Sequence, residues 1–217
     1  MLGLIEKDLR LTFIRKQTLF IFFIIAPIMG LMMYGPFVIG YLTMLAVMVS
    51  IGTISYDEFD NGFVFLMTLP FDRKTYVREK YLFSLTMAAA GWCFGTVLYY
   101  IGNMIRYNTL PLIDELPMLL AYIPALSLSA AIMIPVQLKY GSEKSRIILY
   151  IIFGFIAIAI FGAKSFLGGA NVSFPEVFKF IGSLSPVLLL LILTAVCILV
   201  MYVSYLWSKR IMDKKEF

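Results

Sequence analysis

Apolar residues along this chain gather in long stretches that are separated by short polar segments. A helix needs about 20 mostly apolar residues to cross the hydrocarbon core of a membrane. Six stretches come close to or exceed this length, and none of them contains Asp, Glu, Lys or Arg. They are residues 17–34, 36–56, 81–104, 118–138, 147–163 and 186–207. The pattern predicts an all-α integral membrane protein, with residues 1–217 forming a single transmembrane domain of six spans.

Composition supports the same interpretation. Hydrophobic residues make up 61% of the 217 residues and charged residues only 14%. Soluble domains carry about 45–50% apolar and about 25% charged residues. A small globule cannot bury this much apolar surface, so composition excludes an ordinary soluble protein.

The distribution of cations predicts the orientation in the membrane. Six spans place both termini on one side, together with residues 57–80 and 139–146. The four polar segments on that side contain fifteen Lys and Arg residues, against three on the other side. The positive-inside rule makes the richer side cytoplasmic. Residues 164–185 then lie outside, where their pattern predicts a short helix that dips back into the outer interface.

The first sixteen residues have the pattern of an amphipathic helix. Leu2, Ile5, Leu9 and Phe13 recur at near-helical spacing, and charged residues occupy other positions. Such a helix lies along the membrane surface. A solvated cytoplasmic tail is the alternative.

Residues 57–80 form the longest predicted cytoplasmic segment. It is rich in aromatic and basic residues, and Asp72 stands where an N-cap would begin a helix. A disordered linker is rarely so aromatic. The composition predicts that protein covers this segment, either a partner or the helix ends of the chain itself.

Small residues give the third span a face on which Gly91 and Gly95 follow the GxxxG spacing. Such a face lets two helices approach closely. The spacing leaves open whether the contact lies between subunits or within the chain.

The sequence lacks the residues of several kinds of chemistry. It has no phosphate-binding loop for ATP, no HExxH motif and no histidine. The absence of charge within the predicted spans argues against a proton- or sodium-coupled carrier. Cys93 and Cys197 lie in apolar runs and are expected to be small buried side chains. We predict no catalytic residue, no metal site and no cofactor in this chain, so energy for any work must come from outside the bilayer.

Four local features resemble the ABC-2 type permeases of bacteria. The start, Met1 to Leu9, is similar to the usual start of these permeases. The stretch from Thr68-Leu69-Pro70 to Lys80-Tyr81 resembles the Leu-Pro, Ser-Arg, Tyr-Val, Lys-Tyr stretch after their second span, with Phe71-Asp72 in place of Val-Ser. Tyr140-Gly141 with Glu143 to Arg146, and the basic end 208–217, complete the resemblance.

This resemblance implies a type V exporter-like fold, with six helices per subunit and an N-terminal interfacial helix. It also implies two permease subunits, equal or different, above two nucleotide-binding subunits that hold ATP and Mg²⁺, in the bacterial plasma membrane. The segment between spans two and three would contact the ATPase through these residues: Glu58, Phe59, Leu69, Pro70, Arg73, Lys74, Tyr76, Arg78 and Lys80. In the interfacial helix, Glu6, Lys7 and Arg10 would do the same.

The uncharged spans favour a hydrophobic or amphipathic cargo, with peptides as the leading hypothesis, although no residue is assigned to it. Two alternatives remain open at this point. One is a channel or carrier that works without ATP, and the other is a membrane immunity or scaffold protein that transports nothing.

Overall fold

The computed structural model describes residues 1–14, 20, 24–28, 36–59, 62–107, 115–167 and 185–215. The elements within them are α-helices. They are α1 (Leu2–Ile14), α3 (Phe37–Glu58), α4 (Gly62–Met67), α5 (Arg73–Tyr107), α6 (Leu116–Leu167) and α8 (Pro186–Lys214). The all-α prediction is therefore confirmed for the described part of the chain.

Four helical stretches in the described residues are long and apolar enough to cross a membrane. They are Phe37–Glu58, Arg73–Arg106, Leu116–Ser145 and Pro186–Lys214. These four contain the predicted second, third, fourth and sixth spans. Residues 147–163, the predicted fifth span, are helical but are not among the four. Most of the predicted first span and of segment 164–185 lies outside the described residues, so the count of six stays a prediction.

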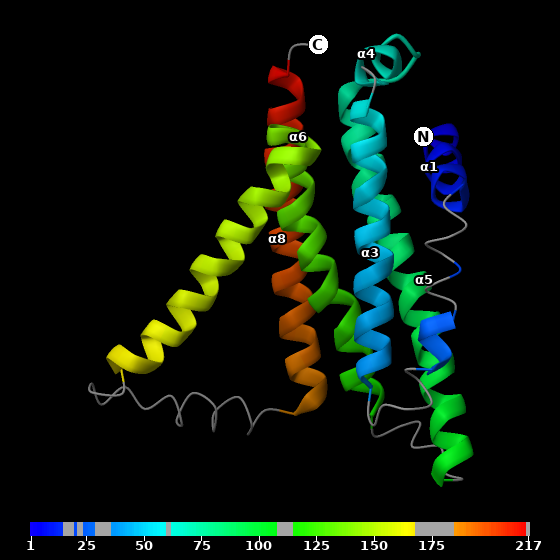
Figure 1. Cartoon of the computed structure of the whole chain (residues 1–217), viewed down its shortest axis with the longest axis vertical. Coiled ribbons are helices and arrows are strands. Elements are labelled where there is room, and N and C mark those ends of the chain that lie inside the picture. Colours follow the sequence, from blue (N-terminus) through cyan, green and yellow to red (C-terminus); the bar gives the residue numbers. More distant parts are fainter. Residues whose placement is uncertain are drawn as a thin grey trace.

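The long helices run side by side, and α6 changes direction part of the way along (Figure 1). Contacts are most extensive between α3 and α5 and between α6 and α8. The second half of α6 diverges from the other helices (Figure 1) and exposes large apolar side chains. The N-terminus, α4 and the C-terminal end of α8 lie towards the same end of the molecule, the end on which the site is built (Figure 1).

The small-residue face of α5 is used within the chain. A Cβ atom at Gly95 would lie 2.8 Å from the Cα of Ile39, and one at Gly91 would lie 2.8 Å from the carbonyl oxygen of Leu42. Both neighbours belong to the backbone of α3 and cannot move aside. Of the two readings left open by the GxxxG spacing, the structure thus supports the contact within the chain, since only glycine allows α3 and α5 to approach this closely.

A proline in α6 helps to attach α8. Pro135 has no N–H to donate to the carbonyl of Ala131 one turn earlier. The hydroxyl of Ser204 on α8 donates to that carbonyl instead. Ser204 and Ser208 also hydrogen-bond the hydroxyl of Tyr81 on α5, at 2.6 Å and 2.8 Å. Hydrogen bonds from hydroxyl groups thus connect α5, α6 and α8, and they fix the relative positions of these helices more specifically than apolar packing alone.

Gly141 interrupts α6. Its φ of 79° and ψ of 173° are non-helical, and residues on both sides of it are helical. The sequence predicts a cytoplasmic turn over residues 139–146. The structure instead confines the break to a single glycine, because the helical residues begin again immediately after it.

Candidate functional site

The short helix α4 stands at the end of the molecule beyond α3. Phe63 and Leu66 point into the core, where Phe63 meets the ring of Tyr76 edge-on at 5.7 Å. A turn follows, in which the N–H of Phe71 donates to the carbonyl of Leu69 at 2.7 Å. Then α5 begins at Arg73. The backbone carbonyl of Asp72 accepts the first two helical bonds, so Asp72 occupies the predicted N-cap position.

The outer side of this segment is apolar and exposed. Phe59 is 72% exposed, Phe65 is 68% exposed, and Val64 and Leu69 are exposed as well. We call these four residues the α4 patch. Exposed apolar patches of this kind mark surfaces that bind another protein or the membrane. Lys74 and Arg78, also exposed, lie on the first turns of α5 close by in sequence.

Beneath this patch lies a group of buried charges from three helices. The ammonium of Lys80 on α5 pairs with Asp8 of α1 and, at 2.7 Å, with Asp57 of α3. Lys7 of α1 pairs with the other oxygen of Asp57 and, at 3.1 Å, with Asp8. We call Lys7, Asp8, Asp57 and Lys80 the charged junction.

Two neutral groups add hydrogen bonds to this junction. The hydroxyl of Thr53 accepts from Lys80 at 3.0 Å and donates to Asp8 at 2.9 Å. The hydroxyl of Tyr76 donates to Asp57 at 2.9 Å. Buried charges are tolerated when they are paired and hydrogen-bonded. Each charge of this network is paired, although the Oδ1 of Asp8 accepts no hydrogen bond from the described residues.

The junction holds Asp8 in its ionised form. Burial raises the pKa of this carboxyl, but the ammonium groups of Lys80 and Lys7 outweigh burial and lower the pKa below its ordinary value. Asp8 is completely buried, whereas Lys7 stays partly exposed. Lys7 is therefore the member of the junction nearest to solvent.

Glu79 adds a third carboxyl to this region. It is fully buried, and neither of its oxygens accepts a hydrogen bond from any residue in the described part of the chain. The nearest paired cation is Lys80, at 3.9 Å. An ionised carboxylate in this position is costly because nothing replaces its lost hydration.

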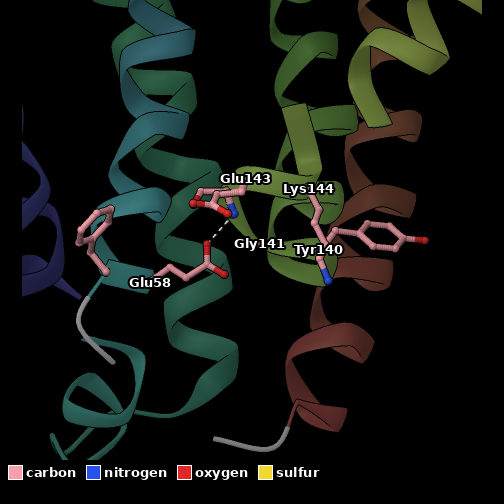
Figure 2. A pocket seen from close by; sticks show the side chains of 7 residues that line it. Glu58, Tyr140, Gly141, Glu143 and Lys144 are labelled. Carbon is pink, nitrogen blue, oxygen red and sulfur yellow. Dashed lines mark hydrogen bonds between the residues drawn. The ribbon is translucent and has the colours of Figure 1, made fainter. Parts of the chain in front are cut away.

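The last residue of α3 ties that helix to α6. The carboxylate of Glu58 accepts from the backbone N–H of Ser142 at 2.6 Å, and Figure 2 shows it directed at the turn around Gly141. It occupies the space that a side chain at Gly141 would need, and the positive φ also favours glycine. A cavity of about 360 Å³ opens here, lined mainly by Glu58, Phe59 and residues 140–144. Tyr140 points away from Glu58 in this view (Figure 2).

The C-terminal end of α8 is fixed to the same region. The guanidinium of Arg73 donates to the carbonyls of Met212, Asp213 and Lys215 at 3.0–3.1 Å. The ammonium of Lys215 donates to the carbonyl of Leu138 at 3.2 Å and lies 4.5 Å from the ring centre of Phe63. Burial lowers the pKa of Lys215, although Glu58 opposes this shift. Segment 57–80 thus contacts α1, α6 and α8 at this end of the molecule.

The structure divides the residues predicted to contact an ATPase into three groups. Exposed members are Phe59, Leu69, Pro70, Lys74 and Arg78, and those in intermediate positions are Glu58 and Arg73. Tyr76 and Lys80 are buried, so in this chain they cannot reach a partner directly. Lys80 is buried for an electrostatic reason, because its ammonium pairs with the carboxylates of Asp8 and Asp57 inside the molecule.

The predicted contacts on α1 also divide. Glu6 and Arg10 are exposed and pair with each other at 2.6 Å. Lys7 turns inwards to Asp57. The buried face of α1 includes Leu4, Asp8 and Thr12, whereas Leu9 and Phe13 of the predicted apolar face are exposed. That exposed face is available to the membrane surface, and its position there stays a prediction.

Sequence reasoning missed Asp8, Asp57, Thr53 and Glu79. One signal was present, because Asp8 stands four residues from both Leu4 and Thr12 and so shares their helical face. Nothing in the sequence indicated that this face meets α3 and α5. The partners of Asp57 lie 19 to 50 residues away in the chain.

Comparison with known proteins identifies the class to which this fold and site belong. The family described as ABC-2 family transporter protein matches residues 3–213. The chain belongs to this family and is a multi-pass membrane protein of the permease type, as the sequence resemblance predicted. Comparison with curated proteins and with solved structures gave no match.

Proposed function

We propose that this chain is the membrane-spanning subunit of an ABC exporter, driven by ATP-binding subunits on separate polypeptides. The observation that carries the proposal is the α4 patch on a member of the ABC-2 family. Its aromatic side chains are exposed beside Lys74 and Arg78, at the end where the N-terminus and the end of α8 also lie (Figure 1).

The exposed residues of segment 57–80 fit a groove on the ATP-binding subunit, with the α4 patch as the apolar centre and Lys74 and Arg78 at its rim. Interfaces of this kind place aromatic residues centrally and charges at the edge. Glu6 and Arg10 of α1 are a second contact. ATP and Mg²⁺ bind on the partner and not on this chain.

Nucleotide binding moves the helices only if the ATP-bound and nucleotide-free partners prefer different arrangements of the permease. Closure of the two ATP-binding subunits pulls on the α4 patch. Helices α3 and α5 move with it, because α4 stands between them in the chain. Two permease subunits, two ATP-binding subunits and a cytoplasmic location of both termini complete the proposal. The cargo is a hydrophobic or amphipathic peptide, because the predicted spans carry no charge.

The test uses the full chain in nanodiscs, co-expressed with its ATP-binding subunit. Phe65→Ser removes the most exposed aromatic ring of α4, and we expect binding of the ATP-binding subunit to weaken by about tenfold or more, as at interface hot spots. Phe155→Ser is the matched control, since Phe155 is an exposed phenylalanine on the second half of α6 and does not line the cavity beside Phe59. Equal binding by the Phe65→Ser variant and the parent would refute the proposed contact.

Transport has its own readout. Cells carrying both subunits are challenged with a cationic amphipathic peptide, and secretion or resistance is compared with cells that lack this chain. Peptide export that continues with an ATPase-dead partner would contradict an ATP-driven exporter.

A further inference from the structure

α1 is attached to the rest of the molecule through a small contact. It touches α3 and α5. Leu4, Asp8 and Thr12 are buried, while Phe13 and Ile14 at the end of the helix are exposed. Burial of one leucine side chain is a small contribution to holding a whole helix in place. The charges therefore decide whether α1 stays in place.

Lys80 is the central cation of this contact. Its ammonium lies between a carboxylate of α1 and a carboxylate of α3, and Lys80 itself is only 2% exposed. Without that ammonium, Asp8 and Asp57 would face each other across a buried space. The partly exposed Lys7 is then the remaining cation of the junction. Two like charges at such distances repel strongly where little water is present to screen them.

Asp57 connects this contact to the proposed ATPase interface. It lies two residues before Phe59 of the α4 patch, on the last turn of α3. A displacement of the patch moves Asp57 first. Through Lys80 the same displacement reaches α5, and through Asp8 it reaches α1.

From this geometry we infer that Lys80 is a positioning residue, which holds α1 against α3 and α5 and makes the three helices move together. The sequence resemblance assigned Lys80 to direct contact with the ATPase, and the buried ammonium acts one step further inside. The holding of α1 is a property of this chain alone. Only the transmission of movement rests on the proposed function.

The test measures the position of α1 directly. Spin labels are attached at Gly3→Cys on α1 and Asp213→Cys on α8, after Cys93→Ser and Cys197→Ala remove the native thiols. Gly3 and Asp213 are both exposed, and a Cβ at Gly3 meets no atom within 4 Å. Distances are read by double electron–electron resonance on the full chain in nanodiscs.

Lys80→Met removes the charge and keeps an unbranched side chain. We expect the distance distribution to broaden and shift as α1 leaves the bundle. Asp8→Asn added to Lys80→Met removes the repulsion, and we expect the narrow distribution to return. A role in packing alone predicts no such rescue, because the second substitution adds no contact. Trp92→Phe is the control, since it removes a hydrogen bond between α5 and α6 and changes neither the junction nor the two labelled helices.

An unchanged distribution in Lys80→Met would overturn the inference, and so would a failure of Asp8→Asn to restore it or an equal broadening in Trp92→Phe. These outcomes need no ATP-binding subunit and are independent of the proposed function. With that subunit present, stimulation of ATP turnover should fall about tenfold in Lys80→Met, within the usual range of coupling between sites. If α1 detaches while stimulation stays normal, the transmission of movement is refuted and the holding of α1 stands.

Discussion

The charged junction and the α4 patch differ in what they expose, although both draw on segment 57–80. The junction buries Asp57 and Lys80 between helices, where each finds partners of opposite charge. The α4 patch leaves Phe59 and Phe65 open at the surface. At these four positions the charged residues are internal and the aromatic residues external, the reverse of the usual arrangement in a soluble domain.

The difference separates a structural role from a contact role within one short segment. Substitutions in the junction should reduce stability and, through it, every activity. Substitutions in the α4 patch should leave stability unchanged and weaken only the binding of the ATP-binding subunit. The predictions below test this separation, beginning with the largest effect.

The first prediction concerns Asp57, which accepts from Lys7, Lys80 and Tyr76. Asp57→Asn leaves the buried ammonium of Lys80 with Asp8 as its close partner and turns an NH₂ group towards donors. Breaking a buried ion pair costs about 3–5 kcal/mol, and we expect a loss of this size in unfolding experiments in detergent micelles.

Asp213→Asn provides the control for this change, because Asp213 is an exposed acid at the same end of the molecule. It should change stability by less than about 0.5 kcal/mol. Similar losses of unfolding free energy in Asp57→Asn and Asp213→Asn would mean that the buried ion pairs of the junction do not stabilise the protein.

The second prediction compares two neighbouring cations that sequence reasoning treated alike. Arg73 donates to three carbonyls at the end of α8, whereas Lys74 is exposed. Arg73→Ala should cost about 1.5–3 kcal/mol, the value of hydrogen bonds to a charged group. Lys74→Ala should cost less than about 0.5 kcal/mol and weaken ATPase binding instead. Thermal unfolding together with a binding assay distinguishes these outcomes, and equal stability of the two variants would contradict the assignment.

The third prediction concerns the loss of stability in acid, and its effect near neutral pH is the smallest of the three. The pKa of Asp8 is lowered from its ordinary value of 3.8 in the folded chain. Its ionisation therefore contributes stability that is complete above pH 3.8 and is lost as the pH falls through the lower folded value. From pH 7 down to about 4, this carboxyl should not release α1, and below that range α1 should detach.

The labelled pair on α1 and α8 measures this response directly. Asp8→Asn should lose the part of the acid response that lies below pH 3.8. Detachment of α1 in the parent chain already near pH 6 would show that a different group controls it.

The all-α membrane class, the places of four long apolar helices and the start of α5 after Asp72 could be read from the sequence. Each follows from a local rule, since 20 apolar residues in succession need lipid or protein around them and an Asp before a helix caps it. The permease family could also be recognised, because its features stand in fixed order along the chain. The buried places of Tyr76 and Lys80 could not be predicted, since both look like surface residues in a basic, aromatic segment.

The sequence by itself determined that this protein is a helical membrane protein of the permease type. Only the tertiary structure decided which charges face solvent and which face each other. The reason is physical, because the cost of burying a charge depends on its partners, and those of Lys80 come from helices that begin far away in the chain. Hydropathy is a property of each residue, whereas ion pairing is a property of the packed bundle.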